Sequence, residues 1–143
     1  MGTAYQNDFY SWTREQARLL REGRLAELDI EHLSEEIEDM GKSEQRALGS
    51  FLETLLIHLL KWAYQIHYPY KRSWQLTILE QRKRILRQLK NNPGLKPTLS
   101  EAMADAYDLA RLGAERETGI PSDVFPERCP WTFEQIADPD FWP

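Results

Sequence analysis

The sequence contains one cysteine, Cys129, among its 143 residues. One thiol cannot form an intramolecular disulfide, and it excludes the zinc motifs that need several cysteines. The longest apolar stretch spans residues 55–60, contains His58 and is far shorter than a transmembrane helix. These absences predict a protein without a membrane span that resides in a reducing compartment, the cytoplasm.

Glycine is also scarce, because the chain has 7 glycines scattered along its length. The sequence therefore lacks a phosphate-binding glycine loop, and it has neither a Gly/Ser linker nor an internal repeat. Lys and Arg number 18 against 23 Asp and Glu, and the net charge of -5 argues against nonspecific nucleic-acid binding by the whole molecule. A chain of this length can bury a sizeable core. We predict a single helical domain over residues 1–143.

Apolar residues recur at helical spacing over nearly the whole chain, and no segment alternates as a strand does. We predict helices over residues 13–22, 29–40, 43–66, 74–90 and 97–118, with Gly41 as a stop or a kink. The tail after Gly119 alternates prolines with aromatic residues, which is typical of a segment that packs its rings on the body of a protein. The predicted fold class is all-α: a helical bundle of about five helices with an irregular Pro/aromatic C-terminal strap.

Particular residues define the expected ends and inner faces of these helices. Thr13 with Gln16 forms a capping box for the first helix, whose Leu19 and Leu20 face inward. Ser73 caps the fourth helix. The third helix is apolar almost all round at its middle, so we expect it at the centre of the bundle. Its apolar stripe consists of Leu48, Phe51, Leu52, Leu55, Leu59, Trp62 and Ile66.

Six blocks of residues follow one another along the chain. They are Asp8-Phe9-Tyr10-x-Trp12 with Gln16-x-x-Leu19-Leu20, Glu35-Glu36-Ile37-Glu38-Asp39-Met40-Gly41, His58-Leu59-Leu60-Lys61-Trp62, Ser73-Trp74-x-x-Thr77-Ile78-x-x-Gln81-Arg82, Glu117-Thr118-Gly119 and Phe125-Pro126-x-x-Cys129-Pro130-Trp131. In this order they cover essentially the whole chain, which resembles the bacterial domain-of-unknown-function family 29. The resemblance implies a small helical bacterial protein and no particular activity.

An arginine falls on the apolar side of the fourth helix. At about 100° per residue, that side carries Ile78, Leu79, Ile85, Leu86 and Leu89. Arg82 projects from its middle, and a buried charge needs a partner. We therefore expect the Arg82 guanidinium to point inward and to be neutralised by a glutamate of another helix. Either these groups form an internal ion-pair network, or the interior holds a polar site. The candidate polar cluster consists of Glu36, His58, Gln81, Arg82 and Glu117.

Acidic residues are concentrated in one part of the sequence and basic residues in another. Residues 27–40 contain seven acids and no base, whereas residues 71–96 contain eight bases and one acid, Glu80. Either the two runs face each other, or each is partly a solvated helix face. A weaker alternative is that the basic fourth helix contacts nucleic-acid phosphates.

Metal and nucleophile patterns are missing or loose. None of the three histidines has a glutamate three residues earlier, so the signature of a di-iron bundle is missing. A looser set, Glu35, Glu36, Asp39 and Glu44, could hold Mg²⁺ or Mn²⁺, but solvated acids on a helix face give the same pattern. We predict no metal site and no cofactor.

Aromatic residues supply the remaining candidate surface. Trp62 and Trp74 flank the segment Tyr68-Pro69-Tyr70, which interrupts the helical pattern. Either the two rings pack this turn against the core, or they form the base of a groove that binds a partner. The candidate interaction surface consists of Trp12, Trp62, Tyr68 and Trp74. Because no catalytic set assembles, we predict a noncatalytic protein-interaction or regulatory module that binds an unknown protein or self-associates as a homodimer. The alternative is an enzyme or metal-dependent protein that uses the interior Glu/His/Arg site.

Overall fold

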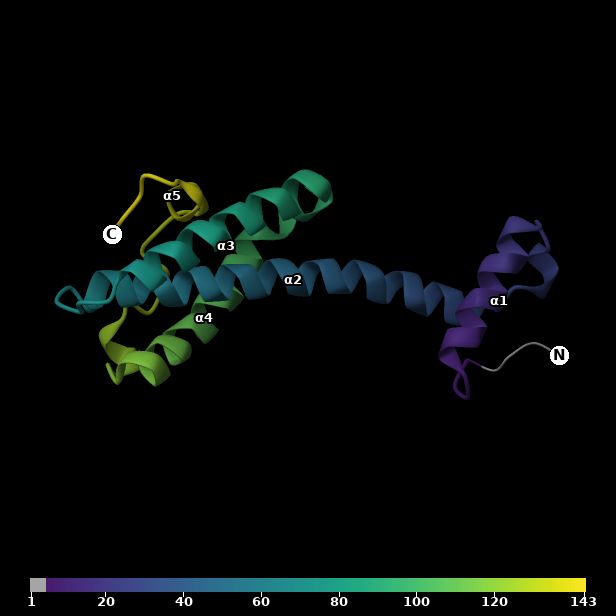
Figure 1. The fold of residues 1–143 in the computed structure, drawn as a ribbon, viewed down its shortest axis with the longest axis horizontal. Coiled ribbons are helices and arrows are strands. Elements are labelled where there is room, and N and C mark those ends of the chain that lie inside the picture. The colour runs from purple at the N-terminus through teal and green to yellow at the C-terminus, as the bar shows by residue number, and fades with distance from the viewer. Residues whose placement is uncertain (1–4) are drawn as a thin grey trace. The chain divides into compact units, whose positions relative to one another are not determined.

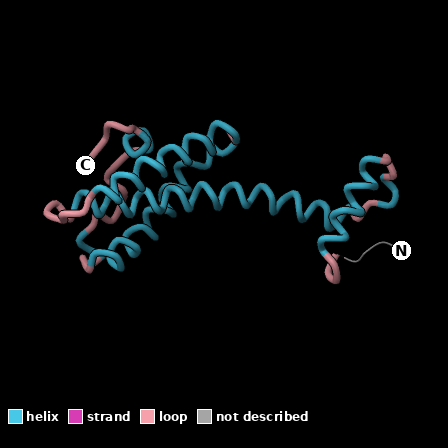
Figure 2. Tube along the Cα trace, viewed as in Figure 1, coloured by secondary structure: helices cyan, strands magenta, loops and turns pink. Residues whose placement is uncertain are grey.

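The computed structural model describes residues 5–143 and builds them from helices (Figure 1). The α-helices are α1 (Phe9–Arg21), α2 (Ile30–Tyr64), α3 (Arg72–Asn91), α4 (Leu99–Thr118) and α5 (Phe133–Ala137), with short 3₁₀ helices at Leu25–Glu27, Pro93–Thr98 and Ser122–Val124. Figure 2 shows loops and no strands in the rest of the described chain, so the predicted all-α fold is confirmed. No helix within residues 5–143 combines the length and the apolar character that crossing a bilayer requires.

The chain divides into two compact units, and the boundary between them falls inside α2. The N-terminal unit ends at Ser43 and contains α1 and the beginning of α2. The C-terminal unit begins at Glu44 and contains the rest of α2 and all later elements. One helix therefore belongs to both units. A single domain over residues 1–143 stays a prediction.

The largest departure from the expected helices is at Gly41. α2 runs through this position for 35 residues, so the helices predicted over residues 29–40 and 43–66 are one helix. Gly41 is not among the glycines with positive φ, and its backbone fits the helix. A glycine inside a helix costs about 1 kcal/mol relative to alanine, and good helix formers on both sides, such as Met40 and Lys42, outweigh that cost. A stop at Gly41 is therefore wrong.

α1 begins one turn earlier than expected. Asp8 caps it, because the backbone N–H of Ser11 donates to Asp8 Oδ1 at 3.0 Å. The capping box at Thr13 and Gln16 is wrong, since the Thr13 hydroxyl donates to a carbonyl of the preceding turn and Gln16 is buried. Gly23, with φ of 70°, follows the end of the helix as predicted.

The core of the C-terminal unit forms around the second part of α2, which confirms the prediction that this segment is central. Figure 1 shows α3 and α4 alongside it. Its fully buried residues include Leu52, Leu55, Leu56, Leu59 and Leu60. α4 approaches closely because small residues such as Ala110 and Gly113 face the core. A Cβ on Gly113 would lie 2.5 Å from Ile57 Cδ1, so only glycine fits this contact without a shift.

Other expected ends and faces agree in part with the structure. α3 begins at Arg72, and Ser73 does not cap it, because Ser73 lies in the first turn and its carbonyl accepts the Thr77 hydroxyl at 3.0 Å. Ile66 is 71% exposed because α2 ends at Tyr64, two residues before the predicted end. Leu86 is also exposed, although the helical pattern predicted it on the inner side of α3.

The segment after α4 forms the predicted irregular C-terminal strap (residues 120–143), which Figure 1 draws in yellow at its end, beside α3. It buries Phe125 and Ile136. It also contains α5, which the sequence did not predict. A capping box starts this helix, because the Gln135 N–H donates to Thr132 Oγ1 at 3.2 Å and the Thr132 N–H donates to Gln135 Oε1 at 2.9 Å. The strap thereby brings its last residues onto α3.

Candidate functional site

Arg82 points into the C-terminal unit, as the helical pattern predicted, and is 2% exposed. Its partners are backbone carbonyls of the strap. Nε donates to the Ile136 carbonyl at 2.7 Å, Nη2 to the Phe141 carbonyl at 2.6 Å and Nη1 to the Pro139 carbonyl at 3.4 Å. We call this set of contacts the Arg82 latch, because three separate nitrogens hold one segment of chain.

The glutamate expected to neutralise Arg82 is not there. No ion pair links Arg82 to an acid within residues 5–143, and the prediction of a glutamate partner is wrong. Burial lowers the pKa of the Arg82 guanidinium, and the nearby charge of Asp138 opposes this effect. The ring of Trp142 covers the guanidinium, whose central carbon lies 5.1 Å from the ring centroid. Carbonyl dipoles and an aromatic face therefore replace a carboxylate.

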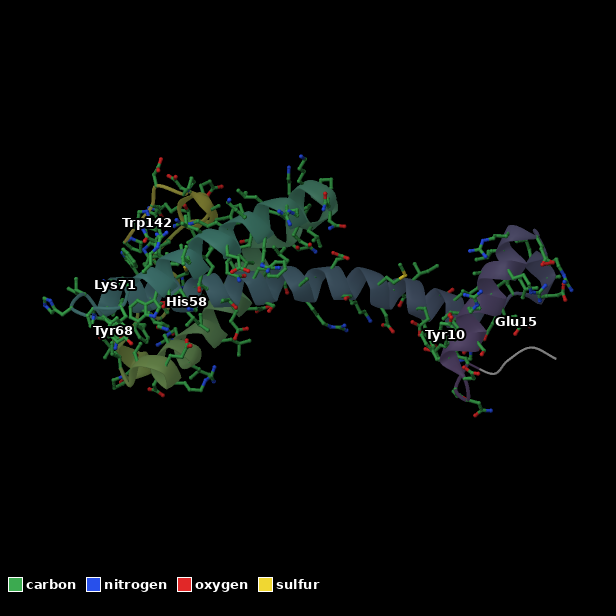
Figure 3. The ribbon with its side chains drawn as sticks, viewed as in Figure 1. Tyr10, Glu15, His58, Tyr68, Lys71 and Trp142 are labelled. Atoms are coloured by element: carbon green, nitrogen blue, oxygen red, sulfur yellow. The ribbon has the colours of Figure 1, made fainter. Side chains whose placement is uncertain are left out.

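Trp142 connects the latch to the turn between α2 and α3. The ring centroids of Trp142 and Trp62 lie 4.8 Å apart. Lys71 Nζ lies 4.8 Å from the ring centroid of Trp62. Lys71 also donates to the Trp62 carbonyl at 3.2 Å. Figure 3 shows Trp142 and Lys71 at the same end of the C-terminal unit. The two rings of Trp142 and Trp62 thus lie between the cations of Arg82 and Lys71.

A second cation–aromatic group lies at the same turn. Lys61 Nζ is 4.7 Å from the ring of Trp74, and Tyr68 stacks on that ring at 4.6 Å and 11°. Tyr68 is 43% exposed, and Ile66 and Tyr70 in the same loop are more exposed still. Three of the four residues predicted as an interaction surface, Trp62, Tyr68 and Trp74, therefore gather at this turn, while Trp12 belongs to the N-terminal unit.

Within the described residues, members of the predicted polar cluster have different partners. His58 Nδ1 pairs with the Thr54 carbonyl at 2.8 Å, and burial lowers the pKa of His58, with a smaller contribution from Lys61 in the same direction. Glu117 is exposed and lies 3.9 Å from Lys61 Nζ. These two residues share Lys61 as a neighbour, whereas Arg82 is held by the strap.

The other two members of the predicted cluster are placed separately. Gln81 Oε1 is buried without a hydrogen-bond partner among the described residues. Glu36 lies in the N-terminal unit, where it accepts a hydrogen bond from the Tyr5 hydroxyl. An interior site that uses all five residues stays a prediction.

The N-terminal unit carries an apolar groove between α1 and the first part of α2, with a volume of about 320 Å³. Its floor includes Trp12 and Leu33, and its rims include four well-exposed apolar side chains. These rim residues are Phe9 (49% exposed), Leu20 (52%), Ile37 (65%) and Met40 (67%). The inward position predicted for Leu20 is wrong, while Leu19 is buried as predicted.

A hydrogen-bond network holds the two helices that form this groove. Asp29 accepts from Trp12 Nε1 at 2.9 Å and pairs with His32 Nδ1 at 2.7 Å. Its own N–H donates to Gln16 Oε1 at 2.8 Å, which explains why a glutamine is buried here. Tyr5 stacks on the His32 ring at 4.2 Å. The residues from Tyr5 to Ser43 therefore form a defined helical hairpin, which we call the N-terminal hairpin.

Sequence reasoning missed both sets of partners. Asp29 is the first residue of the helix predicted over residues 29–40, and nothing in the sequence connects it to Trp12 or His32. The carbonyl acceptors of Arg82 carry no signal at all, because every residue has a carbonyl. Gln16 was a signal for a buried hydrogen bond, because this polar residue lies one turn after Trp12 and one turn before Leu19.

A hollow of the C-terminal unit lies between α4 and the strap, with a volume of about 770 Å³. Met103, Trp131 and Cys129 are among the residues that line it. Burial raises the pKa of the Cys129 thiol, which disfavours the thiolate and hence nucleophilic reactivity. The Cys129 thiol donates to the Trp131 carbonyl at 3.4 Å.

The charge runs and the loose metal set are distributed over both units. The acidic run lies in the N-terminal unit and the basic run in the C-terminal unit. On α3, Lys83, Arg87 and Lys90 are exposed, so nucleic-acid binding by this helix stays a prediction. Within residues 5–143, no group of three or more His, Cys, Asp or Glu side chains is arranged to hold a metal ion.

The fold and these sites define a class: a small all-α protein whose buried charges are held by backbone carbonyls and aromatic rings, with exposed apolar surface on a helical hairpin. The family model described as "Domain of unknown function DUF29" matches residues 4–142, and the chain belongs to that family. No curated protein and no solved structure matches the chain.

Proposed function

We propose that this chain is a noncatalytic protein-interaction module and that the N-terminal hairpin receives a helical segment of its partner. The observation that carries this proposal is the groove itself, a gap between two helices whose rims are apolar and exposed. Contiguous apolar patches on soluble proteins are concentrated at interaction sites. A groove between two helices is suited to the apolar face of a further helix.

The spacing of the rim residues supports a helical partner. On α1, Phe9, Thr13, Ala17 and Leu20 line the groove. On α2, Leu33, Ile37 and Met40 line the opposite wall. Both sets repeat every three to four residues, as the apolar positions of a helix packed on a neighbour do. The hairpin thus presents a mostly apolar stripe from each of its two helices to the groove, which is the surface that a helix of the partner would cover.

The C-terminal unit supports a noncatalytic role. Its most conspicuous polar groups are occupied in structural contacts, because Arg82 holds the strap and His58 pairs with a carbonyl of its own helix. The lowered pKa of His58 and the raised pKa of Cys129 follow from burial and not from a catalytic partner. We extend the proposal to a reducing, cytoplasmic compartment, which the single thiol supports.

Site-specific photo-crosslinking tests this function. A photoreactive amino acid replaces Leu20 at the groove, and a matched control carries it at Leu112 on α4, which is exposed to nearly the same extent (54% against 52%). Expressed in the cells from which the gene comes, the Leu20 position should give one dominant crosslinked protein, and the Leu112 position should not. If neither position gives a product, or if both give the same mixture, the proposed function is wrong.

A further inference from the structure

The N-terminal hairpin buries few residues of its own. Its buried residues are Trp12, Gln16 and Leu19, and one of the three is polar. Units of about this size usually need disulfides, metals or oligomerisation to supply the missing stability. A disulfide is excluded because the only cysteine, Cys129, lies in the other unit. A metal is not supported either, since the described residues contain no suitable ligand group. Further apolar burial is the remaining source.

The charges beside the groove indicate what covers it. Arg14 and Arg21 are exposed on α1 at i and i+7, on the outer side of its apolar stripe at about 100° per residue. Glu31 and Glu38 are exposed on α2 at the same spacing, on the outer side of the opposite stripe. One edge of the groove face is therefore basic and the other acidic. Such a face is complementary to itself.

We infer that the occupant of the groove is a second copy of this chain, bound hairpin to hairpin about a two-fold axis. In a two-fold interface the same surface is used on both sides. If the axis runs along the groove, α1 of each copy covers α2 of the other, and each basic edge meets an acidic edge. The four helices then form a bundle that encloses Leu20, Ile37 and Met40 of both copies. This inference rests on the proposed function and names the partner.

The size of the face sets the expected affinity. α1 has 13 residues, so its length is about 20 Å at 1.5 Å per residue. A face two helices wide and of this length lies at the small end of specific interfaces. We expect a dissociation constant in the micromolar range, because interfaces of that size are weak or transient.

Sedimentation equilibrium of the full chain, from about 1 to 200 μM, measures this affinity. The wild type should change from monomer to dimer over the range. Leu20→Ser should raise the dissociation constant by about 30-fold, because each dimer loses two buried leucines. The matched control Leu112→Ser should leave it unchanged. A wild type that stays monomeric throughout, or a control that weakens the dimer as much as Leu20→Ser, overturns the inference.

A charge exchange tests the arrangement of the two copies. Arg14→Glu/Arg21→Glu and Glu31→Lys/Glu38→Lys should each weaken self-association at least tenfold, because like charges then meet. Mixed in equal amounts, the two variants should form a heterodimer of near wild-type affinity. All four positions are exposed, and circular dichroism confirms that helix content is unchanged. If mixing restores nothing, the hairpin-to-hairpin arrangement is wrong.

The crosslinking experiment separates failure of this inference from failure of the proposed function. A product of twice the 16.9 kDa chain, containing this protein alone, supports the second copy. A product with a different protein leaves the interaction function standing and rejects the second copy. No product from the Leu20 position rejects both.

Discussion

Removing the Arg82 latch should destabilise the C-terminal unit by about 3 kcal/mol. Two of its hydrogen bonds are short, those to Ile136 and Phe141 at 2.7 and 2.6 Å. A hydrogen bond with a charged donor contributes about 1.5–3 kcal/mol, so the pair contributes about 3–6 kcal/mol. Arg82→Met keeps an apolar stem in place, and the released carbonyls regain water when the strap detaches. The net loss should therefore lie near the lower end of the range.

Equilibrium urea unfolding followed by tryptophan fluorescence measures this loss, since Trp142 and Trp62 lie against the latch. Arg84→Met is the matched control. Arg84 is on the same helix, is half exposed and pairs only with Glu80 among the described residues, apart from a distant aromatic contact. Its removal should cost no more than about 1 kcal/mol. Hydrogen exchange should show faster exchange over residues 136–142 in Arg82→Met and not in the control.

Arg82→Lys distinguishes the charge from the shape of the guanidinium. Lysine keeps the positive charge but presents its donors from a single nitrogen, so it cannot hold carbonyls that lie around a planar fork. We expect it to be nearly as unstable as Arg82→Met. Wild-type stability in Arg82→Lys would refute the geometric explanation, and equal stabilities for Arg82→Met and Arg84→Met would refute the latch altogether.

The remaining predictions concern two glycines and two histidines. Gly41→Ala should stabilise the protein by about 0.5–1 kcal/mol in thermal unfolding, because nothing lies near the added Cβ. Gly113→Ala should destabilise it by about 1–2 kcal/mol, because the added Cβ would collide with Ile57. Equal effects of the two changes would contradict the packing of α4. An NMR titration should find the pKa of His32 above 6.5, raised chiefly by its hydrogen bond to Asp29, and that of His58 below 6.5, lowered by burial. The stabilising contribution of His32 is then complete below pH 6.5 and disappears as the pH rises through its folded-state pKa. Protonation of His58 destabilises the fold as the pH falls below 6.5. His32→Gln should remove only the pH dependence that His32 causes.

Helical periodicity predicted most of the fold because each apolar stripe reports the direction of the core. The second part of α2 is the best example, since Leu52, Leu55 and Leu59 were predicted as its inner stripe and are fully buried. Helix ends were predicted less well. At Gly41 the sequence offers a glycine as a stop signal, but the decision depends on the summed propensity of its neighbours, which no single residue shows.

Arg82 shows which part of the site could be predicted from the sequence and which part could not. Its inward direction followed from the helical pattern, because direction is a local property of the helix. Its partners did not follow, because they are backbone atoms 54 to 59 residues away in sequence. For the groove, the part that could not be predicted is what covers it. Ile37 and Met40 follow a helical spacing on one side of α2, yet such a pattern does not say whether the same chain or a partner covers that side.

The latch also has a consequence for the order in which the protein folds. Its bonds join α3 to residues 54 to 59 positions later, while α2 and α3 are neighbours along the chain and meet across a short turn. Closing a long loop costs more entropy than closing a short one, and distant pairings form late. We therefore expect the helices to assemble first, with the Arg82 guanidinium still solvated and Trp62 still uncovered. Closure of the strap then becomes the final and slowest event of folding, and its reversal is the first step by which the C-terminal unit opens.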